Sequence, residues 1–387
     1  MVKVVITGIS LISALGVNFE DAWKNLVAGK SGIRIHKPFP ELEQRPLGLI
    51  GTKPAQVKTL TQQVIDAVLK DAELALPLTD CGVVIGSSRS NQSLWEQMVS
   101  GLARSTMGEI SSTFPHNFSW LDTLPHTNAI AAARQIGTHG IVLAPMAACA
   151  TGIWAIGQAA NLVQTGQCQR VIAGAVEAPI TPLTIAGFQQ MGVLAKTGAY
   201  PFDLHREGLV LGEGAAAFVV ESEELAKRRQ AKIYGQILGF GFTADAYHPT
   251  SPEPHGKSAI AAIKQCLKHS QLLPEDIDHI HAHGTATQLN DRIESNVIQR
   301  LFSRNVPVSS TKGATGHTLG ASGALSVAFS LMSVKHQILL PSIGLQNPEC
   351  DLKFVRVAHH SEIKNVLCFS FGFGGQNAVI ALATFCS

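Results

Sequence analysis

The chain has 387 residues, of which 45% are hydrophobic and 15% are charged, and its formal net charge is +2. This length predicts two domains or one large duplicated domain, and the composition is typical of a chain with a large core and little disorder. The small net charge, without a long basic run, excludes the electrostatic pattern of a nucleic-acid-binding protein.

Seven cysteines are scattered along the sequence, without a CxxC pair. This pattern argues against a disulfide framework and against a structural zinc site. The N-terminus begins with a strand-like pattern, VKVVITGIS, and not with the charged, apolar and cleavage regions of a signal peptide. We therefore expect a cytoplasmic protein, with which free thiols are compatible.

The N-terminal part alternates between apolar strand patterns and amphipathic helix patterns. Lys3–Thr7 is rich in β-branched residues and is followed by Gly8, which predicts a short buried strand that ends there. Such alternation is typical of a layered α/β fold. Further expected elements are the helices Asn18–Ala28, Gln56–Ala75 and Thr127–Gln135, and the strand Val83–Ile85.

A long stretch without charged residues, 135–169, surrounds Cys149. A transmembrane helix needs about 20 apolar residues, but Pro145 and Gly152 are among the residues that interrupt this run. The pattern instead predicts a buried strand at Ile141–Ala144, a tight turn and a helix from about Gly152. Cys149 then lies at a helix N-terminus, where the helix dipole lowers a thiol pKa. A lone cysteine among alanines is also typical of a small core residue.

Two histidines downstream of Cys149 lie in motifs of small residues, HAHGTATQLNDRIES around His283 and SSTKGATGHTLGASGA around His317. Gly284 leaves the imidazole of His283 uncrowded at the end of an expected strand, Ile277–His281. We expect a helix N-terminus at His317 to keep its imidazole neutral. Two neutral imidazoles can donate Nε2–H bonds to one developing oxyanion, which requires a pair. For each histidine alone, an ordinary core or surface role is the alternative.

A weak internal repeat predicts a duplicated fold. The spacing between repeated segments shortens along the chain, so the first half holds about 30 additional residues, which we place at 91–139. The expected halves are 1–240, which contains this insertion, and 241–387. The Cys149 turn of the first half then faces the histidine turns of the second. The repeated segments are 56–85 with 257–281, the Cys149 turn with 306–334, and 218–220 with 378–380.

With these motifs, the chain resembles the β-ketoacyl synthases, the thiolase-fold condensing enzymes of fatty-acid and polyketide synthesis. The resemblance extends nearly end to end and keeps the family order of the motifs. It implies a thiolase-like fold with duplicated α/β halves in a layered αβαβα arrangement. Besides the cysteine and histidine motifs, it is carried by Met1–Arg34, Pro201–Glu221, Asp245–Gly256 and Phe369–Asn377.

The resemblance implies an acyltransferase that extends acyl chains by decarboxylative Claisen condensation with malonyl-acyl-carrier protein, without a metal or an organic cofactor. The implied partners are acyl-carrier proteins and a second copy of the chain in a homodimer. A CoA-dependent thiolase fits less well, because thiolases use a second cysteine and lack the Lys-x4-His motif. A specialised polyketide or glycolipid ketosynthase shares every motif. A non-catalytic chain-length partner subunit usually lacks the nucleophile, here Cys149.

The resemblance also assigns roles to further residues. Lys312 is implied to form a buried pair with Glu294, and the backbone N–H of Phe373 is implied to join that of Cys149 in an oxyanion hole. The alternative for Lys312 is a solvated surface lysine, and the alternative for Phe371–Gly375 is an ordinary glycine-rich turn. For the threonine and serine hydroxyls named next, the alternative is turn capping. The implied substrate-binding residues are Thr250, Ser251, Thr285, Thr287 and Phe202, with hinge glycines Gly372, Gly374 and Gly375.

Three features depart from the family pattern: a shorter loop between Met191 and Pro201, Glu207 in place of an aspartate, and poor alignment of 91–139. The first and third affect the wall of the pocket, and hence the acyl-chain length, more than catalysis.

We also expect a buried polar network, whose members are Asp203, Arg206 and Glu213.

Overall fold

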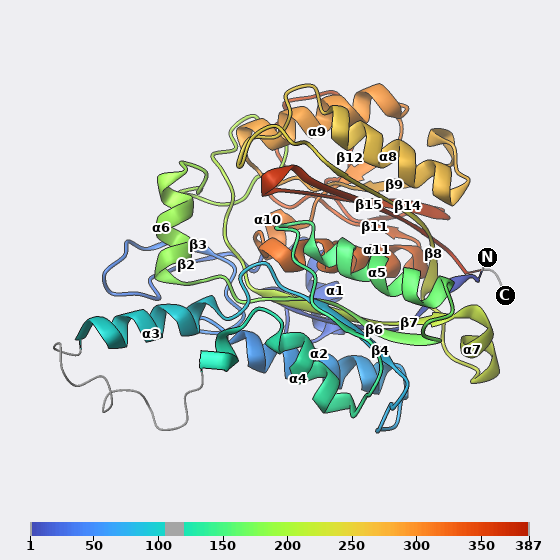
Figure 1. Ribbon diagram of the computed structural model, residues 1–387. Helices are drawn as coiled ribbons and strands as arrows, with labels where there is room; N and C mark the ends of the chain where they lie inside the picture. Colours follow the sequence, from blue (N-terminus) through green and yellow to red (C-terminus); the bar gives the residue numbers. More distant parts are fainter. Residues whose placement is uncertain (1, 105–119, 386–387) are drawn as a thin grey trace.

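The computed structural model describes residues 2–104 and 120–385. In this part of the chain, the core is a sheet of 11 strands whose two halves repeat one strand order (Figure 1). The N-terminal half contains, from the edge inwards, β5 (Val142–Leu143), β4 (Gly82–Gly86), β6 (Arg170–Glu177), β7 (Gly214–Ser222) and β1 (Val4–Ser13). The C-terminal half contains, in the matching order, β10 (Pro307–Ser309), β9 (His279–His281), β14 (Asn365–Gly372), β15 (Gln376–Ala383) and β8 (Gly235–Ala244), with β12 (Lys353–Phe354) beyond β10.

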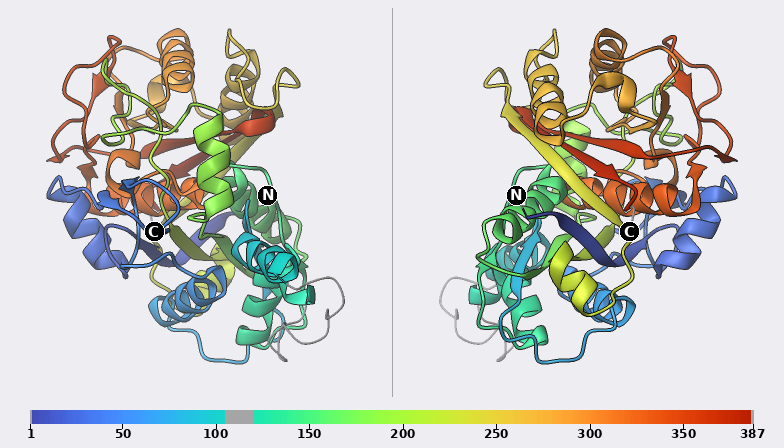
Figure 2. Two further views of the ribbon diagram at one scale, coloured as in Figure 1. Left: turned by 90° about the vertical axis from the view of Figure 1, so that its left-hand side faces the viewer. Right: turned by 90° about the vertical axis from the view of Figure 1, so that its right-hand side faces the viewer.

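Within the described residues, the two half-sheets join only where β1 and β8 pair in antiparallel orientation, over Val4–Ile6 and Gly235–Ile237. Beyond this short contact they diverge and enclose a central layer, as both views of Figure 2 show. The repeated strand order confirms the predicted duplication. The predicted division at residue 240 falls within β8 and stays a prediction.

Helices fill the space between the half-sheets and cover both outer faces (Figure 1). The central helices α5 (Thr151–Gln164) and α11 (Ser322–His336) pack into one hydrophobic cluster with both half-sheets. A Cβ atom on Gly152 would lie 2.4 Å from the Ala324 nitrogen, so this close helix contact requires a glycine. This is the predicted αβαβα order. The outer helices are α2 (Val57–Asp71) and α4 (Thr127–Ile136) on the N-terminal half, and α8 (Lys257–Ser270) and α9 (Gln288–Leu301) on the C-terminal half.

The predicted elements form close to their expected positions. Helix α1 (Phe19–Val27) begins after Asn18, whose side chain accepts a hydrogen bond from the Asp21 N–H. Strand β1 differs, because it continues past Gly8 through a bulge and ends at Ser13. A Cβ atom on Gly8 would lie 2.7 Å from the Cβ of Ala72, so this glycine permits close packing of the segment after α2 and does not end the strand.

The predicted insertion 91–139 contains α3 (Gln92–Arg104), the short helix η1 (Trp120–Thr123) and α4, while its residues 105–119 lie outside the described part. No helix within residues 2–104 and 120–385 is long and apolar enough to cross a membrane. The remaining elements are β2 (Arg34–His36), β3 (Arg45–Leu47), α6 (Pro182–Gln190), α7 (Glu223–Arg228), η2 (Pro274–Asp276), α10 (Lys312–Thr315), η3 (Leu319–Ala321), β11 (Ile338–Leu339), β13 (His359–His360) and η4 (Phe373–Gly375).

Candidate active site

Cys149 lies in the tight turn between β5 and α5, next to the C-terminal end of β14. Ala148 before it has a left-handed φ of 46°, a strained conformation that is typical of functional turns. The Ser370 hydroxyl donates to the Cys149 carbonyl oxygen at 2.8 Å. A Cβ atom on Gly372 would lie 2.9 Å from the Cys149 nitrogen, so a glycine is needed there. This packing brings the Phe373 N–H to the thiol, where it lowers the thiol pKa.

Burial raises the pKa of the Cys149 thiol to about 11, although the Lys312 charge and the Phe373 N–H both lower it. The prediction that the helix N-terminus depresses this pKa is therefore wrong. The N–H groups of Ala150 and Thr151, at the start of α5, donate to backbone carbonyls within the turn. They are not free to stabilise a thiolate, so desolvation of the thiolate dominates.

The two predicted histidines converge on Cys149 from the other half of the fold. The Cys149 sulfur and the nearest ring nitrogens of His283 and His317 all lie within 4.8 Å of one another. The Leu319 N–H donates to Nδ1 of His317 at 3.2 Å, and Nζ of Lys312 lies 3.3 Å from Nδ1 of His283. Because Nδ1 accepts in both rings, the hydrogen bonds assign the proton of each imidazole to Nε2.

Burial lowers the pKa of both His283 and His317 well below the usual range, and the nearby Lys312 charge lowers both further. Both imidazoles are therefore neutral at physiological pH, as predicted. The principal cause is desolvation, and not the helix N-terminus that the sequence suggested.

Lys312 and Glu294 hold His283 from opposite sides of its backbone. Nζ of Lys312 donates to the His283 carbonyl oxygen, and Glu294 accepts the N–H groups of His283 and Gly284 at 2.6 and 2.8 Å. No ion pair found in the described part of the chain joins these two side chains directly, but each charge shifts the pKa of the other. The predicted pairing of Lys312 with Glu294 therefore stays a prediction of electrostatic coupling. Burial lowers the pKa of Lys312 and raises that of Glu294, and the charge of each opposes the shift of the other.

A cavity of about 320 Å³ adjoins the thiol of Cys149 and the imidazoles of His283 and His317. It is lined by seven of the predicted substrate and oxyanion residues. Two others lie elsewhere: Gly374 is outside the lining, and Phe202 is 1% exposed in the core, where its ring packs against Phe354. We therefore leave Phe202 out of the proposed substrate-binding set. The predicted residues in the lining are Thr250, Ser251, Thr285, Thr287, Gly372, Phe373 and Gly375.

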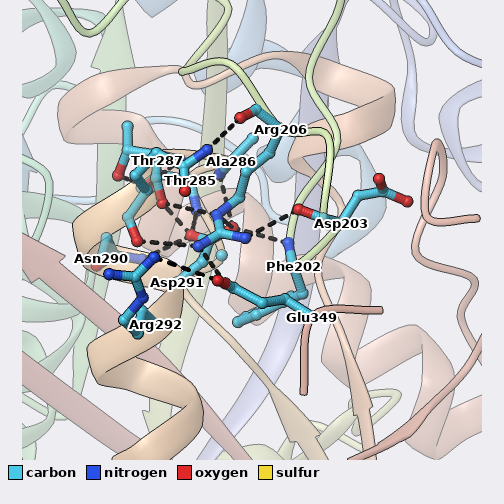
Figure 3. Close-up of polar contacts among 12 residues, drawn as sticks. Phe202, Asp203, Arg206, Thr285, Ala286, Thr287, Asn290, Asp291, Arg292 and Glu349 are labelled. Atoms are coloured by element: carbon cyan, nitrogen blue, oxygen red, sulfur yellow. Dashed lines mark hydrogen bonds and ion pairs between the residues drawn. The ribbon is translucent and has the colours of Figure 1, made fainter. Parts of the chain in front are cut away.

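A buried network holds the loop after His283 that carries Thr285 and Thr287 (Figure 3). Asp291 accepts the Thr285 N–H at 2.9 Å and the Ala286 N–H at 3.1 Å. Arg206, which is fully buried, donates to the Thr287 carbonyl oxygen at 3.1 Å and lies 3.9 Å from Asp291. The Thr285 and Thr287 hydroxyls thereby meet at 2.8 Å beside the cavity. Arg206 thus belongs to the predicted polar network.

Several residues that line the cavity or act on Cys149 were not predicted from the sequence. Phe188 of α6 lies in the lining, with its ring stacked on Phe373 at 6.0 Å and the Arg89 guanidinium 5.7 Å from its centroid on the ring face. Glu177 is buried, and its charge raises the pKa of Cys149. Neither residue lies in a motif, and only the fold brings them to the nucleophile. Other unpredicted lining residues include Met191, Val193, Leu209, Asp245, Asn290 and Phe371.

The duplicated layered fold, with a thiol and two neutral imidazoles at one cavity, defines a thiolase-fold enzyme with a cysteine nucleophile. The family model described as the N-terminal domain of β-ketoacyl synthase matches residues 1–72 and 55–226, and that of the C-terminal domain matches residues 234–346. The chain belongs to the β-ketoacyl synthase family.

Curated relatives and solved structures agree with this assignment. The chain is 34% identical to the putative mitochondrial 3-oxoacyl-[acyl-carrier-protein] synthase of Schizosaccharomyces pombe, over 100% of both chains. It is 34% identical to 3-oxoacyl-[acyl-carrier-protein] synthase 2 of Coxiella burnetii, over 98% of each. A β-ketoacyl synthase from Burkholderia phymatum matches with a TM-score of 0.91 at 28% identity, over 100% of both chains. The ketosynthase complex AntDE:AntF, with its type II polyketide acyl-carrier protein, also reaches 0.91 at 28% identity, over 99% of this chain and 100% of that one.

Proposed function

We propose that the protein is a β-ketoacyl-[acyl-carrier-protein] synthase that condenses an acyl group held on Cys149 with malonyl-carrier protein. The observation that supports this most is the convergence of one thiol and two imidazoles within 4.8 Å at a cavity. In this arrangement His283 and His317 both present Nε2–H toward one substrate oxygen. Such a pair of neutral donors suits an enolate better than a general-base role, because neither Nε2 has a free lone pair.

In the first half-reaction, the Cys149 sulfur attacks the carbonyl carbon of an acyl-carrier thioester. The reacting species is the thiolate, which is a minor form at neutral pH and is stabilised by the Lys312 charge and the Phe373 N–H. The carbonyl oxygen becomes an oxyanion held by the backbone N–H groups of Cys149 and Phe373. The carrier sulfur leaves and takes up the proton that the thiol lost.

In the second half-reaction, the malonyl thioester loses CO2, and the carbon–carbon bond electrons form an enolate. The enolate oxygen accepts Nε2–H bonds from His283 and His317. The enolate carbon then attacks the acyl carbonyl on Cys149, and the sulfur leaves as a thiolate that takes one proton from solvent. Glu294 and Lys312 do not move protons in this scheme, because they hold the His283 backbone and its tautomer.

The hydroxyls and apolar rings in the lining support binding of a carrier arm and an acyl chain. Thr250, Ser251, Thr285 and Thr287 supply hydroxyls for the amide groups of a pantetheine arm. Phe188 supplies an apolar wall near the nucleophile, which we propose limits the length of the acyl chain. The partner in both half-reactions is then an acyl-carrier protein.

We also propose a homodimer and a cytoplasmic location. Exposed apolar side chains on α3 and α6 support the dimer, because Trp95, Val99 and Leu183 are 44%, 61% and 62% exposed in the single chain. Light scattering on the purified protein decides this point, and a monomer at micromolar concentration contradicts it. Cell fractionation tests the compartment. Recovery of the protein in an organelle contradicts the cytoplasmic proposal; the name of the S. pombe relative gives a mitochondrial location for that protein.

A specialised polyketide ketosynthase is the second candidate, because a ketosynthase in a polyketide carrier complex superposes with a TM-score of 0.91. Acyl-carrier proteins of graded chain length, each supplied with malonyl-carrier protein, distinguish the two. One round of extension on saturated chains supports fatty-acid synthesis, whereas activity confined to oxidised or aromatic chains supports the specialised role.

The half-reactions provide the direct test of the proposed function. Cys149→Ala should lose condensation yet retain release of CO2 from malonyl-carrier protein, because both imidazoles remain. His317→Ala should lose CO2 release by about 10²–10³-fold, the range for removing one oxyanion donor. Native decarboxylation by His317→Ala contradicts the assigned role. Cys350→Ser, which changes a half-buried thiol outside the cavity, serves as the control.

A further inference from the structure

The thiol and two imidazoles at the cavity also form a set of metal ligands. Among the residues that the structure describes, Cys149, His283 and His317 are the one group of three or more potential ligands whose donor atoms gather closely, within 4.8 Å of one another. All three side chains are buried, and the cavity of about 320 Å³ supplies space for a further ligand. The proposed reaction uses these three side chains, but none of its steps involves a bound metal ion.

This donor set suits zinc and related thiophilic cations. Zn²⁺ binds thiolate sulfur at about 2.3 Å and imidazole nitrogen at about 2.0–2.1 Å, in a tetrahedron that often has three protein ligands and one open position. Ligand atoms around such an ion lie roughly 3.3–3.8 Å apart in a tetrahedron of this size. The three ligand atoms lie within 4.8 Å of one another, so a small inward movement of the two imidazole rings brings them to these distances.

We propose that Cys149, His283 and His317 bind a Zn²⁺ or similar thiophilic divalent cation when the sulfur carries no acyl group. Binding converts the thiol into a metal thiolate and releases its proton to solvent. Acylation of Cys149 removes the thiolate ligand, so metal and acyl group exclude each other. The binding follows from the ligand geometry alone, whereas the inhibition of acyl transfer that it causes rests on the proposed function.

The surrounding hydrogen bonds weaken this site without abolishing it. Coordination through Nε2 moves the imidazole proton to Nδ1. At His317, the Ser322 hydroxyl lies 2.8 Å from Nδ1 and can accept that proton's hydrogen bond. At His283, Nζ of Lys312 faces Nδ1 at 3.3 Å, so an ammonium group must turn away before the metal binds. Lys312 therefore lowers the affinity for a second positive charge at the same imidazole.

The experiment titrates the chelator-treated full-length protein with Co²⁺ as a spectroscopic probe and with Zn²⁺ by calorimetry. The wild type should bind one equivalent and show a sulfur-to-cobalt charge-transfer band, and Cys350→Ser should retain both. Cys149→Ser should lose the band. His317→Ala removes a proposed ligand and should weaken binding by more than about 10–100-fold, the loss that is typical when a residue only supports a ligand. Lys312→Met should bind about tenfold more tightly, because the ammonium charge that repels the metal ion is removed. Circular dichroism confirms that each variant is folded.

Two results overturn the proposal: a charge-transfer band that survives Cys149→Ser, or the absence of stoichiometric binding by both the wild type and Lys312→Met. A parallel measurement of acyl transfer to Cys149 separates the two claims. Metal binding without any acyl transfer by the metal-free protein contradicts the proposed function and leaves the metal site standing. Acyl transfer without metal binding contradicts the metal site alone.

Discussion

Removal of the Lys312 charge tests how the site is held together. In Lys312→Met, His283 loses the ammonium donor to its carbonyl oxygen and to Nδ1. A hydrogen bond from a charged group contributes about 1.5–3 kcal/mol, so we expect a loss of about 2 kcal/mol in the free energy of unfolding. Glu294 keeps its three hydrogen bonds, from the N–H groups of His283 and Gly284 and from Asn290. The loss is therefore smaller than for a directly broken buried ion pair.

The titration of Glu294 determines how the stability loss of Lys312→Met changes with pH. Burial raises the pKa of its folded-state carboxyl, so the stability linked to this group is complete below its unfolded pKa and is lost as the pH rises through the folded pKa. The Lys312 charge lowers this folded pKa, so Lys312→Met raises it further. The variant should therefore be less destabilised at about pH 5 than at about pH 8, where the carboxylate is ionised without compensation.

A double-mutant cycle in urea measures this effect. Lys312→Met, Glu294→Gln and the double variant should give a coupling energy of about 1 kcal/mol between the pKa of about 7 for Glu294 and that of about 8 for Lys312. The coupling should shrink toward acid pH, where Glu294 is protonated, and toward alkaline pH, where Lys312 is neutral. Arg304→Met, which removes a surface ion pair between side chains that are 79% and 77% exposed, is the matched control and should change little. A coupling energy that is zero at every pH refutes the proposed electrostatic coupling between Lys312 and Glu294.

Three further predictions concern the nucleophile and its surroundings. Because the thiol pKa of Cys149 is raised to about 11, its rate of alkylation by iodoacetamide should rise by about tenfold per pH unit up to that value; a plateau near neutrality contradicts this. Glu177→Gln should lower the pKa, since the Glu177 charge raises it, and an unchanged alkylation profile refutes the coupling. Phe188→Ala should open the apolar wall and admit longer acyl groups, which mass spectrometry of the acyl-enzyme measures against Phe39→Ala, a change outside the cavity.

Much of the fold could be predicted because local patterns agree with the tertiary structure. Asn18 caps α1 as expected for a helix start, and β4 follows its apolar run. Strand β1 was predicted too short, because a glycine that permits packing against a neighbouring segment resembles one that ends a strand. Local sequence cannot distinguish the two roles, since the difference lies in a contact with Ala72, far along the chain.

The site was predictable in its reacting groups and not in its supporting contacts. Cys149, His283 and His317 stand in recognisable motifs and converge as expected. The contact of Lys312 with His283, and the core position of Phe202, depend on how distant segments pack. The direction of the thiol pKa depends on burial, which no local motif reports.

The most direct test of the central claim is mass spectrometry of one reaction that contains the protein, an acyl-carrier protein and malonyl-carrier protein. We predict an acyl group on the Cys149 peptide before malonyl-carrier protein is added. After the addition, the label should be lost as a 3-oxoacyl-carrier product, longer by two carbons, appears together with CO2. An acyl label on any other residue, or a stable Cys149 adduct that never yields the extended product, contradicts the account.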